Sequence, residues 1–477
     1  MKNPEPNSPA VAANPLLQDW TAPYGLPPFS QVRPEHFAPA LAIAMQAQRD
    51  EIDAIAANPQ PPTFDNTVAA LDRSGRLYTR IELLFSNLTV SETNPELQGV
   101  QRELAGPLAA HENALLMHQG LFARIDQLHA QRESLGLDDE SLRLLERYHL
   151  DFVLAGARLA PEARERSAAI TTELADLSTR FAQNLLADEA GWLLELKDEA
   201  DLAGLPESVR SAARGAAQQR GLPEGAHAIT LSPSLAEPFL TMSARRDLRE
   251  QVWRARVQRG ANAGENDNRA IGARIIELRQ EQAALHGHAS YADYALVDRM
   301  ASGTEAVLDL LTQAWEPAKQ KAGEDRVLLT QMAKQLGEPT PIAAWDWRYL
   351  AEKVRQQKFD LDDAELKPYF ALDNMIAAMF DCAGRLFGLK FVEQQGLELY
   401  HPDVRLWEVR DRGDQLVGIF LGDNFARPSK RSGAWMSIFR SQSGFDGGTL
   451  PIVINNNNFA KASPTLLSFD DVLTLFH

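Results

Sequence analysis

The first three quarters of the chain carry apolar residues at helical spacing. Pro34 and Pro161 suit the first turn of a helix, where the missing N–H costs nothing, and Thr304 suits an N-cap. Apolar residues three or four positions apart follow each of them, so each predicts a helix with one buried face. The expected buried positions are Phe37, Leu41, Met45, Ile52 and Ile55 in the first helix, Ile170, Leu174, Leu177, Phe181 and Leu185 in the second, and Val307, Leu308, Leu311 and Trp315 in the third.

Strand-like runs interrupt this pattern in two regions. Residues 192–196 and 228–231 enclose a short helical stretch rich in Ala and Arg. Residues 404–409 and 415–421 predict a β-hairpin, because the turn between them contains glycine. A further strand is expected from Leu450 onward. The predicted fold class is therefore mainly α, with a small β-sheet near the C-terminal end.

A stretch that contains Pro and Ser, at residues 232–238, is the best internal boundary in the sequence. It predicts an N-terminal helical region over residues 1–232 and a second region over residues 233–477.

The composition narrows the classes of partner. The 477 residues include 48 Lys and Arg against 65 Asp and Glu, which gives a net charge of −17. Such a surface repels phosphate backbones and anionic lipid, so nucleic acid and membrane surfaces are not expected as partners. No apolar stretch approaches the length of a membrane-spanning helix.

Cysteine content and the first residues indicate the compartment. Cys382 is the only cysteine, which excludes an intrachain disulfide and a zinc site made of cysteines. Its apolar helical surroundings predict a buried, unreactive thiol. Residues 1–20 are rich in Pro, Asn and Ala and lack the apolar core of a signal peptide. These features predict a cytoplasmic protein.

The last ten residues contain the start of a helix. Ser468 and Asp471 form a capping box, and Asp470 adds a second negative charge at the positive end of the helix dipole. No Gly, Asn or Pro stop signal follows. Because helices shorter than roughly 12–15 residues are marginal in isolation, the sequence looks cut within this helix. Its apolar side chains, Val472, Leu473, Leu475 and Phe476, are then expected to be exposed.

The order of elements here is a strand, a loop and a capped apolar helix that bears a histidine. The same order leads into the zinc-binding H-E-x-x-H motif of metallopeptidases. Other motifs extend this likeness over nearly the whole chain. They are Pro28-Phe29, the run from Pro61 to Thr67, Trp345-Asp346-Trp347-Arg348-Tyr349, Phe359-Asp360-Leu361-Asp362, Leu366-Lys367-Pro368-Tyr369-Phe370, Leu386-Phe387-Gly388-Leu389, the run from His401 to Glu408, and Ser432-Gly433-Ala434-Trp435-Met436. With these motifs the sequence resembles the thimet oligopeptidase (M3) family of zinc metallopeptidases, closest to its peptidyl-dipeptidase, or dipeptidyl carboxypeptidase, branch.

The resemblance implies two helical lobes, a zincin-like catalytic region, a channel that admits short unstructured peptides, and one catalytic Zn²⁺. Of the family's zinc ligands, only the first has a counterpart here, His477. The catalytic glutamate, the second histidine and a further glutamate ligand would follow it. A catalytic zinc takes three protein ligands and a water. We therefore expect the chain alone to be inactive, with a separate C-terminal fragment as one way to complete the site.

The resemblance also implies that an extended substrate pairs with an edge strand beside the metal helix. Residues 450–457 fit that place in chain order. The alternative is an ordinary strand that ends in a polar Asn turn, preceded by a plain connector. The candidate substrate contacts are Ile452, Val453, Ile454, Asn455, Gly447 and Gly448.

Three functions remain open. Release of C-terminal dipeptides is the one that the resemblance implies, and internal cleavage by a family oligopeptidase is the first alternative. The other is a non-catalytic helical scaffold that binds peptides. Arg427, Lys430 and Arg431 could attract a peptide carboxylate, although a solvated surface loop is the better interpretation of these charges.

Overall fold

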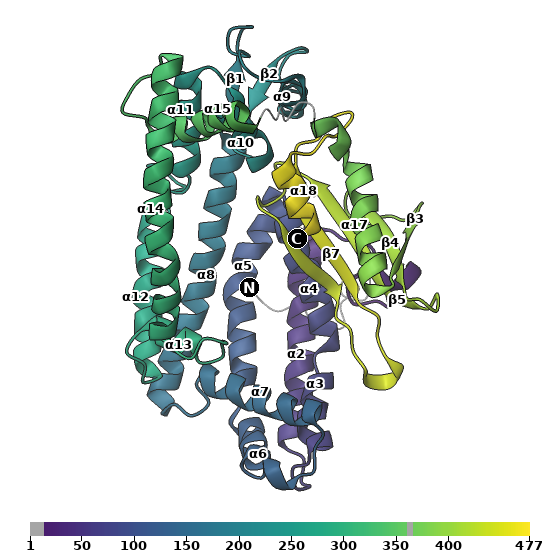
Figure 1. Ribbon diagram of the computed structural model, residues 1–477. Helices are drawn as coiled ribbons and strands as arrows, with labels where there is room; N and C mark the ends of the chain where they lie inside the picture. Colours follow the sequence, from purple (N-terminus) through teal and green to yellow (C-terminus); the bar gives the residue numbers. More distant parts are fainter. Residues whose placement is uncertain (1–13, 360–365) are drawn as a thin grey trace. The chain divides into compact units, whose positions relative to one another are not determined.

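The computed structural model describes residues 14–359 and 366–477. Residues 1–13 of the Pro-rich start and 360–362 of one family-like motif lie outside that range. The chain forms two compact units, drawn in Figure 1. Unit 1 comprises Met1–Thr89, Thr93–Gln183 and Asn268–Leu311, and unit 2 comprises Val90–Glu92, Asn184–Asp267 and Thr312–His477.

The described residues of unit 1 form helices and the loops between them, without a strand. Its elements are η1 (Pro23–Gly25), η2 (Pro34–His36), α2 (Phe37–Ala56), η3 (Phe64–Ala69), α3 (Ala70–Arg73), most of α4 (Arg76–Ser91), α5 (Pro95–Leu116), α6 (Gln119–Ala130), η4 (Arg132–Ser134), α7 (Asp139–Ala155), the larger part of α8 (Pro161–Gly191), α12 (Arg269–Leu285), α13 (Tyr291–Leu296) and the start of α14 (Thr304–Leu336).

Burial follows the predicted faces in two of the three helices chosen from the sequence. In α2, Phe37, Leu41 and Ile52 are buried, and α8 begins at Pro161 and buries Ile170. The third expectation is wrong. In α14, Leu308, Leu311 and Trp315 are 61%, 57% and 64% exposed, because the described chain covers only the C-terminal half of that helix. That half buries Leu329, Met332 and Ala333 against Tyr349 and Leu350.

Unit 2 combines helices with both sheets of the structure. Its elements are the ends of α4 and α8, β1 (Leu194–Leu196), α9 (Glu207–Gln219), β2 (His227–Ile229), α10 (Pro233–Met242), α11 (Arg246–Val257), the remainder of α14, η5 (Ala344–Asp346), α15 (Trp347–Phe359), η6 (Lys367–Phe370), α17 (Leu372–Phe387), β3 (Lys390–Gln394), β4 (Arg405–Arg410), β5 (Leu416–Phe425), β6 (Trp435–Arg440), η7 (Phe445–Gly447), β7 (Ile452–Phe459) and α18 (Phe469–Phe476). The mainly α fold with a small sheet near the end of the chain is confirmed.

The units divide the chain differently from the expected boundary between residues 232 and 233. That position lies inside unit 2, at the N-cap of α10. One hydrophobic cluster spans it, since Leu196 and Ala213 on one side pack with Phe239 and Val252 on the other. A core shared in this way keeps the two flanking segments in one unit.

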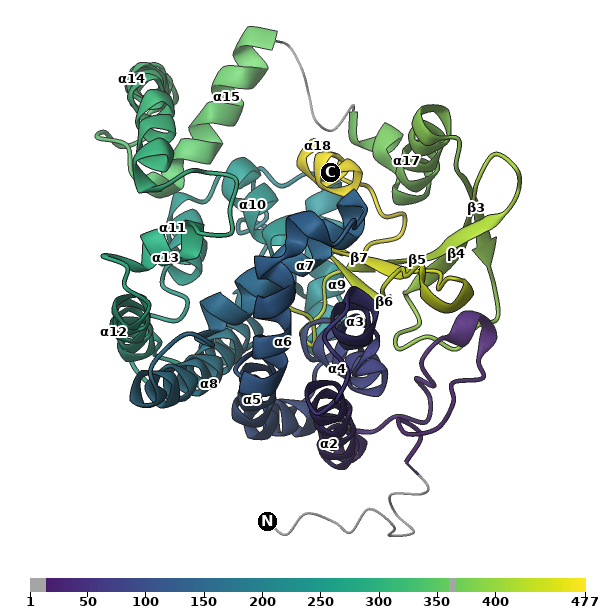
Figure 2. The same cartoon turned by 90° about the horizontal axis from the view of Figure 1, so that it is seen from below.

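The larger sheet has the strand order β3-β4-β5-β7-β6. β4 and β5 form the predicted antiparallel hairpin, and β7 runs parallel to β5 and antiparallel to β6 (Figure 1, Figure 2). The sequence pattern did not predict β3 or β6. One face carries α17, because Phe380 of that helix contacts Phe391, Trp407 and Phe420 of β3, β4 and β5.

Helices of the described residues are too short or too polar to cross a bilayer. Cys382 lies exposed on α17, so the prediction of a buried thiol is wrong. The apolar face of α17 is turned to the sheet, and Cys382 lies on the other face of that helix.

Candidate active site beside the five-stranded sheet

The short helix α18 begins at a side-chain cap and packs on the sheet through one buried side chain. The Ser468 hydroxyl accepts a hydrogen bond from Asp471 N at 3.0 Å, and the Asp471 carboxylate accepts one from Ser468 N at 3.0 Å, as the capping box predicts. Leu475 is buried and packs with Phe459 of β7 and with Trp407. Figure 1 shows α18 beside β7, with the end of the chain at its tip.

The expected exposure of the apolar side chains of α18 is only partly found. Leu473 and Phe476 are 53% and 42% exposed, whereas Leu475 is 3% exposed and Val472 contacts the same cluster. The sheet and α17 cover that side of the helix, which accounts for the difference. His477 follows the last turn of the helix and is exposed.

The strand chosen from the sequence for substrate pairing lies inside the sheet. Val453 of β7 pairs with Phe420 of β5 on one side and with Ile438 of β6 on the other. The expectation that residues 450–457 form an edge strand is therefore wrong, and a peptide cannot add to the backbone of β7. The sequence gives no local sign of this, since both neighbours come from other parts of the chain.

The six candidate contacts on and before β7 have different environments. Ile452 and Ile454 are buried, and Val453 and Asn455 alternate with them on the opposite face of the strand. The asparagines do not form a polar turn. They continue the strand, where Asn457 and Asn458 donate hydrogen bonds to Asn424 Oδ1 and to the carbonyls of Arg431 and Gly433.

Gly447 and Gly448 belong to the loop that joins β6 to β7. Their φ angles are 89° and 91°, a region that residues with a Cβ rarely adopt. Ser443 and Thr449 close the base of the loop with two backbone hydrogen bonds of 3.2 and 2.8 Å. The glycine pair therefore permits a tight connection between two antiparallel strands.

The terminal strand of the sheet on this side is β6. Met436 pairs with Asn455 of β7, and its side chain is 67% exposed. Asn455 and Val453 share a face of β7, and Val453 pairs with Phe420, which contacts α17. Met436 therefore lies on the face of the sheet that carries α17, and α18 packs into the cluster on that face.

A buried network of charges, which the sequence pattern did not predict, fixes the loop that follows β5. Asp423 and Lys430 have fully buried side chains, and Lys430 Nζ lies 2.8 Å from Asp423 Oδ1. Lys430 also donates to the carbonyls of Asp423 and Asn457, at 2.8 and 2.6 Å. Arg427 holds the same carboxylate with two hydrogen bonds of 2.9 and 2.7 Å. The interpretation of a solvated loop is therefore wrong for Arg427 and Lys430.

Burial and charge shape the pKa values in this network. Burial lowers the pKa of Lys430 to about 8, against the opposing attraction of Asp423. Burial would raise the pKa of Asp423, but the hydrogen bonds from Arg427 and the charge of Lys430 outweigh it and hold that pKa below its usual range. One sequence signal could have revealed the network. It is an aspartate inside an apolar strand that is followed by cations four and seven residues later.

His477 is the one predicted metal ligand. Among residues 14–359 and 366–477, no group of three or more His, Cys, Asp or Glu side chains is arranged to hold a metal ion. A catalytic zinc needs three protein ligands, so the described residues alone do not fit a zinc site. No catalytic step is therefore assigned to a metal held by these residues.

The sequence of the chain matches a known protein family and several known proteins. The model of peptidase family M3 matches residues 239–477. The chain is 41% identical over 468 residues to a dipeptidyl carboxypeptidase of Escherichia coli (strain K12), which covers 97% of this chain and 68% of that protein. It is 39% identical over 471 residues to a dipeptidyl carboxypeptidase of Salmonella typhimurium, with 98% and 69% covered. It is also 32% identical over 473 residues to an oligopeptidase A of Escherichia coli (strain K12), with 97% and 69% covered.

Proposed function

This chain belongs to peptidase family M3, and we propose on that premise that it forms part of a zinc-dependent enzyme that hydrolyses short peptides. The observation that carries the proposal is the 41% identity with a dipeptidyl carboxypeptidase over 97% of the chain. The position of His477 supports it, since an exposed histidine ends a capped helix that packs on the sheet.

His477 is proposed as one zinc ligand. The remaining ligands would come from a separate C-terminal fragment, because the described residues of this chain supply too few. Zinc held by such a site would lower the pKa of a bound water and polarise the peptide carbonyl. The contribution of this chain is then a rigid support, since Leu475 and the Ser468 cap fix the direction in which α18 ends.

We propose that the peptide substrate lies along β6 and not along β7. At residues 435–437, β6 pairs with β7 on one side and is the last strand of the sheet. An extended peptide added there would form hydrogen bonds through its backbone irrespective of its side chains, which suits a peptidase of broad specificity. Gly447 and Gly448 follow that edge in the loop to β7 and remain proposed contacts.

Release of C-terminal dipeptides is the proposed reaction, because the two dipeptidyl carboxypeptidases are 41% and 39% identical to the chain. Internal cleavage is the second candidate, supported by the 32% identity with oligopeptidase A. The enzyme is proposed to act in the cytoplasm. The chain has a single cysteine, which is exposed, so its fold needs no disulfide and no oxidising compartment.

Matched peptides distinguish the two reactions. The chain is co-expressed with the part of the Escherichia coli dipeptidyl carboxypeptidase that lies outside the match, and that part alone serves as the blank. A hexapeptide with a free C-terminus is compared with its C-terminal amide, and the products are identified by mass spectrometry. We expect dipeptides from the free peptide and little cleavage of the amide. Equal internal cleavage of both would favour the oligopeptidase, and no cleavage of either would overturn the proposed activity.

A further inference from the structure

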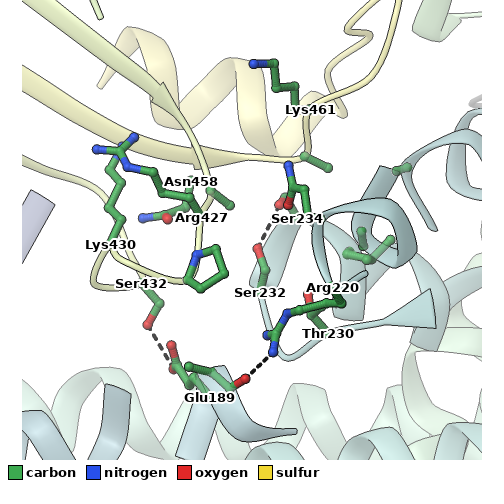
Figure 3. Close-up of a pocket in the computed structure, with 18 of the residues that line it drawn as sticks. Glu189, Arg220, Thr230, Ser232, Ser234, Arg427, Lys430, Ser432, Asn458 and Lys461 are labelled. Atoms are coloured by element: carbon green, nitrogen blue, oxygen red, sulfur yellow. Dashed lines mark hydrogen bonds between the residues drawn. The ribbon is translucent and has the colours of Figure 1, made fainter. Parts of the chain in front are cut away.

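A polar pocket in unit 2 lies away from His477 in the chain and has no role in the proposed reaction. Figure 3 shows its lining, which comes from the end of α8, α9, the start of α10, the loop after β5 and the end of β7. On one side lie Arg220, Thr230, Ser232 and Ser234. The pocket therefore gathers one guanidinium and three hydroxyl groups from a short stretch of chain.

Arg220 is the cation in this pocket that lacks an acidic partner among the described residues. Its guanidinium donates a hydrogen bond to the carbonyl of Ala190. Burial lowers the pKa of Arg220, and no neighbouring carboxylate opposes that shift. A half-buried charge without a counterion is costly, and an anion from solution would offset that cost.

The other charged groups of the lining are already neutralised. Arg427 pairs with both Asp423 and Glu92, Lys430 pairs with Asp423, and Lys461 binds Asp403 through two contacts of 2.7 Å. Glu189, the acidic residue of the lining, pairs with Arg259 and accepts a hydrogen bond from Ser432. Arg220 therefore remains as the uncompensated charge of the pocket.

The two serine hydroxyl groups retain a hydrogen that can be donated to a ligand. Ser232 Oγ and Ser234 Oγ lie 3.0 Å apart, so one of the two donates to the other and the second keeps a free hydrogen. Ser232 is the N-cap of the ten-residue helix α10, yet its side chain makes no cap hydrogen bond. Its hydroxyl is therefore not needed by the helix, and the positive end of the helix dipole lies at the same place.

The size of the pocket limits the ligand. Its volume of about 80 Å³ is roughly five times the minimum of about 15 Å³ that one water requires. It can therefore hold an ion of a few heavy atoms, but not an oligopeptide. We propose that this pocket binds a small tetrahedral oxyanion, free phosphate or sulfate, held by the guanidinium of Arg220 and the hydroxyls of Thr230, Ser232 and Ser234.

Titration calorimetry of the whole chain with inorganic phosphate, in a buffer free of other oxyanions, tests the proposal. We expect one phosphate per chain. Because a hydrogen bond to a charged group contributes about 1.5–3 kcal/mol, Arg220→Gln should weaken binding about tenfold to a hundredfold. Arg385→Gln is the matched control, since that side chain is 80% exposed on α17, far from this lining in the chain. It should bind phosphate as the wild type does.

A second variant guards against a folding defect in Arg220→Gln. Ser232→Ala removes a hydroxyl that caps no helix, so its melting temperature should stay within the error of the wild type while its affinity for phosphate falls. Absence of phosphate and sulfate binding by the wild type would overturn the proposal. Equal affinity in the wild type and in folded Arg220→Gln would also overturn it.

Adenosine monophosphate separates a free ion from the phosphoryl group of a larger ligand. A nucleoside does not fit within about 80 Å³, so inorganic phosphate should bind more tightly than the nucleotide. Tighter binding of the nucleotide, lost in Arg220→Gln, would contradict the assignment to a free ion.

Discussion

Ile438 of β6 lies opposite Val453 of β7 in antiparallel register, so Val453 is paired on the side where an edge was expected. Because Phe420 of β5 pairs with it on the other side, Val453→Pro should damage the fold itself. Loss of one N–H leaves a buried acceptor unsatisfied, which costs about 1–3 kcal/mol. Urea denaturation should show that loss. A Val453→Pro protein as stable as the wild type would contradict the central position of β7.

The edge of the sheet at residues 435–437 can be tested by a pair of neighbouring variants. Successive N–H groups of a strand point to opposite sides, so one of Met436 and Ser437 directs its N–H toward β7 and the other directs it outward. Of Met436→Pro and Ser437→Pro, we expect one to destabilise the sheet and the other to stay folded. The folded variant should bind an extended peptide about two- to tenfold more weakly, as measured by fluorescence anisotropy. Wild-type affinity in the folded variant would place the peptide elsewhere.

Asp346 is predicted to be a stabilising residue and not a catalytic one, although it lies in a family-like motif. Its carboxylate accepts hydrogen bonds from Arg246 at 3.0 and 2.9 Å and lies 3.2 Å from Nη2 of Arg249, whose side chain is fully buried. Asp346→Asn would leave the buried guanidinium of Arg249 with only the more distant Glu338, at 3.9 Å, as an acidic partner, so stability should fall by about 3–5 kcal/mol. Asp247→Asn is the control, because its ion pair with Arg245 is largely exposed and should contribute at most about 1 kcal/mol. Similar unfolding free energies for the two variants would refute the assignment.

Local patterns predicted the elements well and their neighbours poorly. The spacing of Ile170 and Leu177 gave the buried face of α8, and the glycine-containing turn gave the β4–β5 hairpin. The parallel pairing of β7 with β5 joins segments far apart in sequence, and no local signal encodes it. The central position of Val453 therefore required the structure.

The same limit applies to charged residues. Arg and Lys side chains are usually solvated, and the burial of Arg427 and Lys430 is compensated here by ion pairs with Asp423 and, for Arg427, with Glu92. Asp423 lies in an apolar strand, where an aspartate is itself unusual. At His477 the reverse holds, since the capped helix was correctly predicted from sequence, while the described residues contain no group of three or more side chains that could hold a metal ion.

The acid stability of the protein should depend in part on His111 of unit 1. This ring is buried, with Nε2 at 2.8 Å from Gln48 Oε1 and Nδ1 at 3.2 Å from Nη1 of Arg49. Burial, together with the charge of Arg49, lowers the pKa of His111 to about 4. The unfolded chain, with a pKa of about 6.5, then binds the proton more readily, so stability should fall as the pH drops from about 6.5 to about 4.

His111→Gln checks the sign of this effect. The variant cannot take up a proton at this position, so its melting temperature should fall less than that of the wild type between neutral and mildly acidic pH. It should also melt below the wild type at neutral pH, because the bond to Gln48 is changed. Parallel pH profiles for the two proteins would show that His111 does not titrate differently in the folded and unfolded states.

Zinc binding should require more than this chain. His477 is a single ligand, and the described residues offer no group of three, so the purified chain is predicted to bind no stoichiometric zinc and to cleave no peptide. Co-expression with the part of the Escherichia coli dipeptidyl carboxypeptidase outside the match should restore both, measured as metal content and hydrolysis. His477→Ala should then remove zinc and activity together, whereas His118→Ala, which removes a hydrogen bond to Asp53 in unit 1, should change neither. Chelator-sensitive hydrolysis by the rigorously pure chain would overturn the first expectation, and full zinc content in the His477→Ala complex would remove His477 from the ligand set.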